Sequence, residues 1–265
     1  MISHLTILVI VLLSLGAGPT VAGEKPPTLR ELKQAAAASP QDPQAHYSLG
    51  LQYESLGQTK KAIGEYRKSL SLKPDNAKAL YSLGRLMNQL GESEKAIEII
   101  KQAVKFNPKF QEARSLLAAV YNQQAIAFMN QGNLDAARQA LETGIQAKGG
   151  PAETETLRNN LGCLYVRENK LDQAVGTFRE VLRQNPDVPQ AHYNLALIYY
   201  ATGNPQAAYV EFFALKGLDR DLAAQLSDYR FRPETSTYAT PPVKTMQMKP
   251  SPVFVGGNIP LETGY

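Results

Sequence analysis

Residues 45–53 read AHYSLGLQY, and residues 191–199 read AHYNLALIY. Related stretches lie between them, ALYSLG at 79–84 and RNNLGCLY at 158–165. A segment that recurs in this way is typical of a protein built from stacked copies of one structural unit. Within each copy the apolar and small residues keep the spacing of one face of a helix. We therefore expect every copy to begin with an α-helix.

Each copy continues with the same order of features: a turn residue suited to positive φ, then an alanine, then a large apolar residue four positions later. The turn residues of successive copies are 34 apart between Gly57 and Gly91, and again between Asn169 and Gly203. Small residues such as Gly50 and Gly84 would let two helices pack closely, so the pattern predicts helical hairpins. The turn residues are Gly57, Gly91, Gly132, Asn169 and Gly203. The alanines are Ala62, Ala96, Ala137, Ala174 and Ala208, and the large apolar residues are Tyr66, Ile100, Leu141, Phe178 and Phe212.

This pattern resembles the tetratricopeptide repeat, which has a period of about 34 residues. The resemblance implies an all-α fold, a right-handed superhelical solenoid of helix-turn-helix repeats in which stacked hairpins form the cooperative unit. A Thr28–Glu31 capping box predicts a half-repeat helix before the first full repeat. We expect a half-repeat helix at 28–42, five repeats at 43–76, 77–110, 118–151, 155–188 and 189–222, and a capping helix at 223–231.

The third repeat departs from the period, because Gly91 and Gly132 are 41 residues apart. Apolar residues keep helical spacing through the extra stretch, from Phe110 to Phe128. We therefore expect the first helix of this repeat to be about two turns longer than the others. Such an extension would either form a ledge for docking or dimerisation, or adjust the curvature of the solenoid.

The amino-terminal residues 1–22 have the layout of a signal peptide. They carry no Lys, Arg, Asp or Glu, contain an apolar run from Leu5 to Leu15, and end in the small residues Thr20-Val21-Ala22. The alternative is an uncleaved anchor formed by residues 2–21 in the inner membrane. Both interpretations place the repeats outside the cytoplasm, so we expect an exported protein, periplasmic or secreted.

The carboxy-terminal segment 232–265 is rich in proline and has no helical period. Its composition predicts a disordered tail. The alternative is that its extended stretch Pro252–Val255 docks on a partner or on the solenoid itself.

No motif for enzymatic chemistry is present: the chain has no glycine-rich phosphate loop, HExxH, GxSxG or acidic metal loop. We expect no enzyme activity and no cofactor. His46 and His192 fall at a repeat position that packs between helices, and Cys163 is expected to be an inert thiol. The net charge of +4 includes no cluster of five or more Lys and Arg residues, which argues against nucleic acid as a ligand.

In proteins with this repeat, the first helices line a concave groove that holds a partner segment. The resemblance implies that tyrosines, asparagines and two arginines would bind a protein or peptide segment, with the arginines favouring acidic character. The chaperone-binding version of the fold needs Lys and Asn where this chain has Tyr47 and Leu51, so a chaperone partner is disfavoured. The expected groove residues are Tyr47, Tyr81, Arg85, Asn88, Asn122, Asn159, Arg167, Tyr193, Asn194 and Tyr200, with Asn160 at the edge.

These features predict a non-enzymatic protein–protein interaction scaffold in the cell envelope, for assembly of an envelope, pilus or secretion complex. The envelope role rests on the leader together with fold analogy. The alternative is a permanent structural subunit that docks through its tail and the extended helix of repeat 3. A homo-oligomer is compatible with both, and membrane contact would come only from an uncleaved amino terminus.

Overall fold

The computed structural model describes residues 26–226 and 248–250, and every secondary-structure element within these ranges is a helix. The described chain forms two compact units, one ending at Pro108 and the other beginning at Lys109. The predicted leader 1–22 and the stretch Pro252–Val255 lie outside the described residues. Within the described ranges no helix has both the length and the apolar character needed to span a bilayer.

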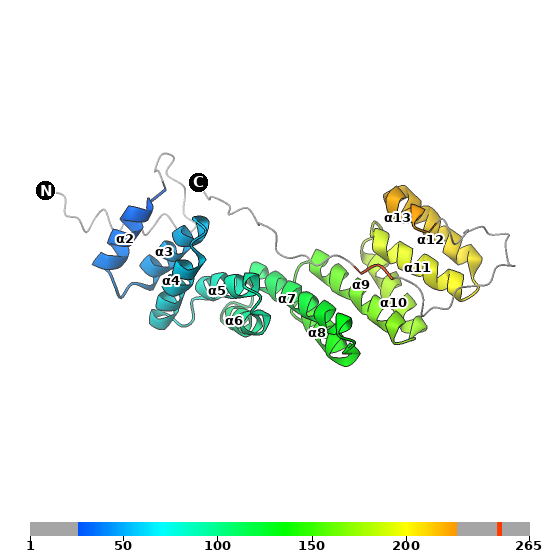
Figure 1. Ribbon diagram of the computed structural model, residues 1–265, viewed down its shortest axis with the longest axis horizontal. Helices are drawn as coiled ribbons and strands as arrows, with labels where there is room; N and C mark the ends of the chain where they lie inside the picture. Colours follow the sequence, from blue (N-terminus) through cyan, green and yellow to red (C-terminus); the bar gives the residue numbers. More distant parts are fainter. Residues whose placement is uncertain (1–25, 227–247, 251–265) are drawn as a thin grey trace. The chain divides into compact units, whose positions relative to one another are not determined.

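The first unit contains a single helix followed by two helical hairpins (Figure 1). Its first helix begins with the predicted capping box: the Thr28 N–H donates to Glu31 Oε2 at 2.7 Å, and the Glu31 N–H donates to Thr28 Oγ1. The bounds are α2 (Leu29–Ala38), α3 (Pro43–Ser55), α4 (Thr59–Leu72), α5 (Ala77–Gln89) and α6 (Ser93–Phe106).

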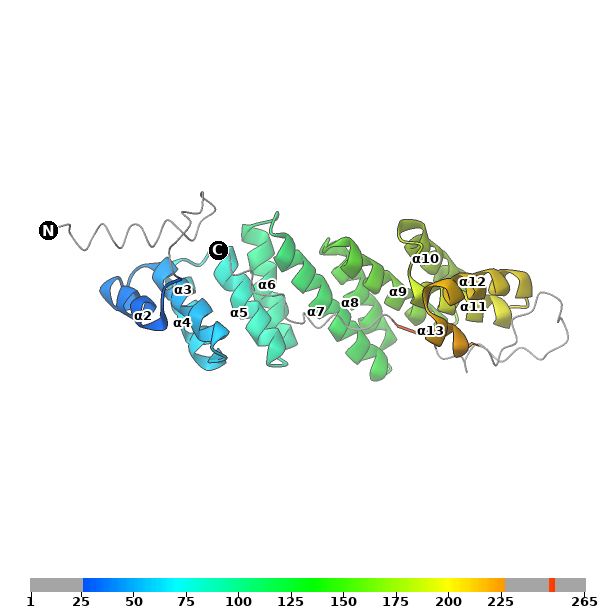
Figure 2. The same cartoon turned by 90° about the horizontal axis from the view of Figure 1, so that it is seen from above.

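The second unit contains three hairpins and a short final helix (Figure 2). Its first helix, α7, runs without interruption for 20 residues, which confirms the predicted extension. The bounds are α7 (Gln111–Asn130), α8 (Leu134–Gln146), α9 (Pro151–Arg167), α10 (Leu171–Gln184), α11 (Pro189–Ala201), α12 (Pro205–Leu218) and α13 (Arg220–Ala224).

Close contacts across the hairpins explain the glycines at the small position of the repeat. A Cβ atom on Gly50 would lie 2.6 Å from Cε1 of Tyr66, and one on Gly162 would lie 2.6 Å from Cε1 of Phe178. Both aromatic rings are fully buried, so they have no room to move aside. All five predicted turn residues have positive φ, from 60° at Asn169 to 79° at Gly91. The hairpins therefore follow from local spacing.

Two boundaries differ from the prediction. Pro151, expected to end the third repeat, is instead the first residue of α9, a position where its missing N–H costs nothing. The third hairpin begins at Gln111, ahead of the repeat boundary at 118, as the predicted extension of its first helix requires. The final helix begins at Arg220 and not at 223, because the Asp219 side chain accepts a hydrogen bond from the Leu222 N–H at 2.8 Å and caps it. It ends at Ala224, and residues 227–231 of the predicted capping helix lie outside the described ranges.

Candidate functional site

Four buried asparagines lie on the first helices of the second unit. Asn122 is on α7, Asn159 and Asn160 are on α9, and Asn194 is on α11, and each is at most 2% exposed. The Asn160 amide donates to Asn122 Oδ1 at 2.7 Å, and the Asn194 amide lies 3.4 Å from Asn159 Oδ1. We call these four residues the asparagine cluster. Their amides are the kind of group that pairs with the N–H and C=O of an extended chain.

The segment Met248–Pro250, from the predicted tail, contacts this cluster and is drawn in red in Figures 1 and 2. The Lys249 N–H donates to Asn194 Oδ1 at 2.8 Å. Its carbonyl oxygen accepts from Asn194 Nδ2 at 3.0 Å and from Asn159 Nδ2 at 3.2 Å. One side-chain amide therefore satisfies both main-chain polar groups of a single residue, as a neighbouring β-strand would.

The side chain of Lys249 also makes a specific contact. Its Nζ atom lies 5.7 Å from the centre of the Tyr193 ring, within the range of a cation–π interaction. Pro250 restricts Lys249 to an extended backbone, because the proline ring disfavours helical φ and ψ at the preceding residue. Lys249 is not among the predicted site residues, although the Lys-Pro dipeptide is a signal for an extended residue with a charged side chain.

Two other predicted groove residues of the second unit, Tyr200 and Arg167, lie toward the ends of their helices. Tyr200 is half-buried near the end of α11. Arg167 is exposed at the end of α9, where its Nη1 donates to the Met129 carbonyl at 2.8 Å. Within this unit, the structure brings Asn122, Asn159, Tyr193 and Asn194 into one region.

In the first unit, the predicted residues Tyr47, Tyr81, Arg85 and Asn88 are half-buried. Arg85 forms an ion pair with Glu54, a residue that the sequence analysis did not single out. The other carboxylate oxygen of Glu54 accepts from the Tyr66 hydroxyl at 2.7 Å. Arg85 is thus engaged by a carboxylate of its own chain, and an acidic partner segment remains a prediction.

The two histidines of the repeats hold helices together in the same way. Nδ1 of His46 lies 2.7 Å from Glu65 Oε2, and Nε2 lies 3.1 Å from the Pro40 carbonyl. His192 repeats this arrangement with Glu211 at 2.6 Å and the Pro186 carbonyl at 2.9 Å. Each ring therefore links its own helix to the next helix and to the preceding loop, which is a packing role.

Cys163 is buried beneath the cluster, 3.5 Å from the Asn194 amide nitrogen. Burial raises the pKa of its thiol to about 12, although the hydrogen bond from Asn194 lowers it in part. A thiol of this kind is protonated at neutral pH and therefore a poor nucleophile.

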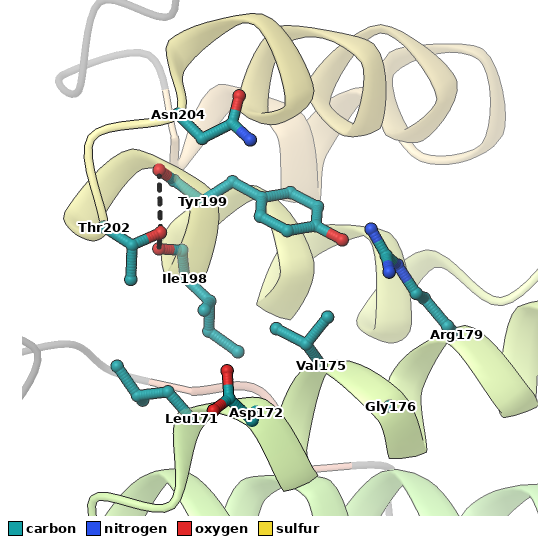
Figure 3. Close-up of a pocket in the computed structure, with 9 residues that line it drawn as sticks. All are labelled: Leu171, Asp172, Val175, Gly176, Arg179, Ile198, Tyr199, Thr202 and Asn204. Atoms are coloured by element: carbon teal, nitrogen blue, oxygen red, sulfur yellow. Dashed lines mark hydrogen bonds between the residues drawn. The ribbon is translucent and has the colours of Figure 1, made fainter.

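A shallow pocket lies between α10 and α11 (Figure 3). Two of its polar groups have structural roles: the Thr202 hydroxyl donates to the Ile198 carbonyl at 2.9 Å, and Asn204 caps α12 through the Ala207 N–H. The Arg179 guanidinium lies 5.7 Å from the centre of the Tyr199 ring. No group of three or more His, Cys, Asp or Glu side chains suited to a metal occurs within residues 26–226 and 248–250. The asparagine cluster is therefore the stronger candidate site.

Comparison with known families agrees with the helical hairpins. Models of the tetratricopeptide repeat match residues 53–120, 118–149 and 159–217, which together cover more than half of the chain. The protein belongs to the tetratricopeptide-repeat family. Members of this family bind peptides or proteins and are typically non-catalytic scaffolds, so the fold is that of a protein–protein interaction scaffold.

Curated relatives match over part of the chain. "Photosystem I assembly protein Ycf3" of Synechococcus sp. (strain CC9605) is 26% identical over 91 residues, which are 34% of this chain and 53% of the relative. "Intraflagellar transport protein 70A" of Homo sapiens is 33% identical over 88 residues, 31% of this chain and 13% of the relative. The match therefore spans about half of the Ycf3 protein and a much smaller part of the human one.

Two solved structures share the fold. YrrB, described as a TPR protein with an unusual peptide-binding site, has a TM-score of 0.53 at 18% identity, covering 76% of this chain and 100% of that structure. The pilF protein of Pseudomonas aeruginosa has a TM-score of 0.51 at 16% identity, covering 85% of this chain and 96% of that structure. At these identities the likeness concerns the fold alone.

Proposed function

We propose that this protein is a non-enzymatic scaffold of the cell envelope that binds an extended segment of a partner protein during assembly of an envelope, pilus or secretion complex. The observation that carries the binding mode is the pairing of Asn194 with both main-chain polar groups of Lys249. Main-chain recognition of this kind gives affinity for an extended segment, while neighbouring side chains give selectivity.

Two further observations support an assembly role outside the cytoplasm. Residues 1–22 have the composition of a signal peptide. Relatives that match a third of the chain bear the name of an assembly protein. Export is tested separately from binding: mass spectrometry of the protein from its own cells should show a chain beginning near Gly23, and a chain retaining residues 2–21 would favour the membrane anchor.

Partner capture tests the binding mode. A photo-crosslinking amino acid is placed at Tyr200, near the end of α11, in the chain expressed in its own cells. A matched variant carries the same group at Tyr209, an exposed residue of α12. We expect a partner to crosslink from position 200 and not from position 209, and mass spectrometry of the crosslinked peptide then identifies the bound segment.

Affinity for the identified segment completes the test. An Asn159→Ala/Asn194→Ala variant removes the amides that pair with a main chain, and Asn130→Ala removes an exposed amide at the end of α7 as a control. We expect the double variant to bind at least about tenfold more weakly, the effect of about 1.4 kcal/mol, and the control to bind as the unmodified chain does.

The alternative function predicts a different result. A permanent structural subunit docked through the extended helix would crosslink from Glu112, an exposed residue at the start of α7, and would keep its partner in the double asparagine variant. That pair of results would overturn the proposed binding mode and favour the structural role.

A further inference from the structure

The main chain of Lys249 and the asparagine cluster form a ligand-and-site pair within one chain. Three hydrogen bonds of 2.8 to 3.2 Å join Lys249 to Asn159 and Asn194, side chains that the structure buries completely. A buried amide without hydrogen-bond partners would cost about 1–3 kcal/mol. In this structure the main chain of Lys249 supplies hydrogen-bond partners for both amides.

We propose that Met248–Pro250 is an intramolecular ligand of the asparagine cluster, and that the cluster selects an extended segment carrying lysine. A partner segment of the same chemistry, a lysine with an extended main chain, must displace Met248–Pro250 in order to bind. This inference rests on the proposed function for its partner, but the site and its internal ligand are defined by this chain alone.

The selectivity for lysine comes from Tyr193. The Lys249 ammonium lies 5.7 Å from the Tyr193 ring centre, so a cation gains a contact there that a neutral or acidic side chain lacks. Arg85 and Arg167 led to the prediction of an acidic partner segment. Beside Asn159 and Asn194, however, the bound residue is Lys249, with its ammonium against the Tyr193 ring, and we therefore assign a basic segment to this site.

An internal ligand lowers the apparent affinity for any external one. A segment tethered to its own site acts at an effective concentration on the order of 1 mM, when the tether can span the distance. The apparent dissociation constant of a competitor then equals its intrinsic value divided by the fraction of sites that the tail leaves free. Binding of a partner should thus release the tail, which couples the two events.

The test uses the full-length chain and a fluorescein-labelled synthetic peptide of residues 245–254, TMQMKPSPVF, as the probe. Lys249→Pro removes the N–H that donates to Asn194 Oδ1, and because residue 249 lies outside the helices we expect the hairpins to stay unchanged. We expect the Lys249→Pro chain to bind the peptide at least about tenfold tighter than the unmodified chain. Adding Asn194→Leu should abolish that gain, and a peptide carrying the same proline substitution should not bind.

A second substitution separates main-chain from side-chain recognition. Lys249→Met keeps all three main-chain hydrogen bonds and removes the cation, so its chain should show a smaller gain, about two- to fivefold. Equal peptide affinity in the unmodified and Lys249→Pro chains would overturn the proposal, and so would an unchanged affinity after Asn194→Leu. Neither result would affect capture of a partner from position 200, so the two proposals fail separately.

A direct readout covers the case in which the free peptide binds too weakly to measure. The chain has no tryptophan, so Met248→Trp introduces a single indole beside Lys249. We expect its emission to be blue-shifted relative to Met248→Trp/Lys249→Pro, at all protein concentrations. Identical spectra would overturn the internal ligand, and a shift that disappears on dilution would assign the segment to a second copy of the chain instead.

Discussion

The Nδ1 atom of His192 on α11 lies 2.6 Å from Oε2 of Glu211 on α12, while its Nε2 atom lies 2.9 Å from the Pro186 carbonyl. Both ring nitrogens thus face acceptors, an arrangement that suits the doubly protonated imidazolium. Burial lowers the pKa of His192, but the hydrogen bonds to Glu211 and Pro186 and the charges of Glu211 and Asp187 outweigh it and raise the pKa above its ordinary value.

Because the pKa of His192 is raised in the folded state, the free energy of unfolding should depend on pH. A group with a raised pKa in the folded state binds more protons when folded, so its contribution is complete below the ordinary pKa of about 6.5 and is lost as the pH rises through the folded-state pKa. We expect His192→Gln to lower the free energy of unfolding more at pH 5.5 than at pH 9, as measured by urea denaturation. A difference that stays constant between the two pH values would contradict this prediction, and Glu211→Gln should reduce the pH dependence in the same way.

Two glycines of one hairpin should respond oppositely to alanine. A Cβ on Gly50 would overlap the buried Tyr66 ring, so Gly50→Ala should lower the free energy of unfolding by about 1–3 kcal/mol. Gly64 lies in the interior of α4 with open space around it, so Gly64→Ala should raise this free energy by up to about 1 kcal/mol through helix propensity. Urea unfolding of both variants provides the measurement, and changes of the same sign would contradict the packing argument.

The hairpins could be predicted from sequence because their determinants are local. Gly50 and Tyr66 are both fixed by the repeat, and positive φ at Gly57 is required by a short turn whatever the rest of the chain does. Pro151 was assigned to the wrong side of its boundary because proline both follows helices and starts them. In the structure, the Gly150 N–H donates to Ser115 Oγ on α7 at 3.2 Å. This contact holds the residue that precedes α9, so Pro151 becomes the first residue of that helix.

The site was predicted only in part, because its ligand lies far away in sequence. Asn159 and Asn194 were found from their repeat positions, but Lys249 is 90 and 55 residues from them and belongs to no repeat. The engagement of Arg85 was also missed. Its partner Glu54 is 31 residues away, and repeat position alone does not show whether an arginine faces a ligand or a carboxylate of its own chain.

Cys163 should be protected from alkylation in the folded protein. Burial raises the pKa of its thiol to about 12, so at pH 8 the reactive thiolate is much scarcer than in an exposed thiol. We expect iodoacetamide to modify the chain slowly under native conditions and rapidly in guanidinium, as followed by mass spectrometry. Equal rates in the two conditions would show that the thiol is accessible in the folded state.

The ion pair between Arg85 and Glu54 should contribute to the stability of the first unit. Glu54 has a side chain that is 10% exposed and pairs with Arg85, so Arg85→Met leaves a largely buried carboxylate that has lost its cation. We expect this change to lower the free energy of unfolding by about 1.5–3 kcal/mol, since hydrogen bonds to charged groups contribute in this range. Glu54→Gln/Arg85→Met should restore part of the loss, because the neutral amide no longer needs a cation.

The same two variants, Arg85→Met and Glu54→Gln/Arg85→Met, test whether Arg85 also binds a partner segment. Its guanidinium carries five donors, and the bond to Glu54 engages Nη2, so an acidic partner segment would have to share the group or compete for it. If Arg85 only holds Glu54, the double variant should recover part of the lost stability and bind the captured partner as the unmodified chain does. If it also binds a partner carboxylate, stability should recover to the same extent while affinity stays reduced. Measuring unfolding and partner affinity on the same two variants therefore separates the structural role of this arginine from a binding role.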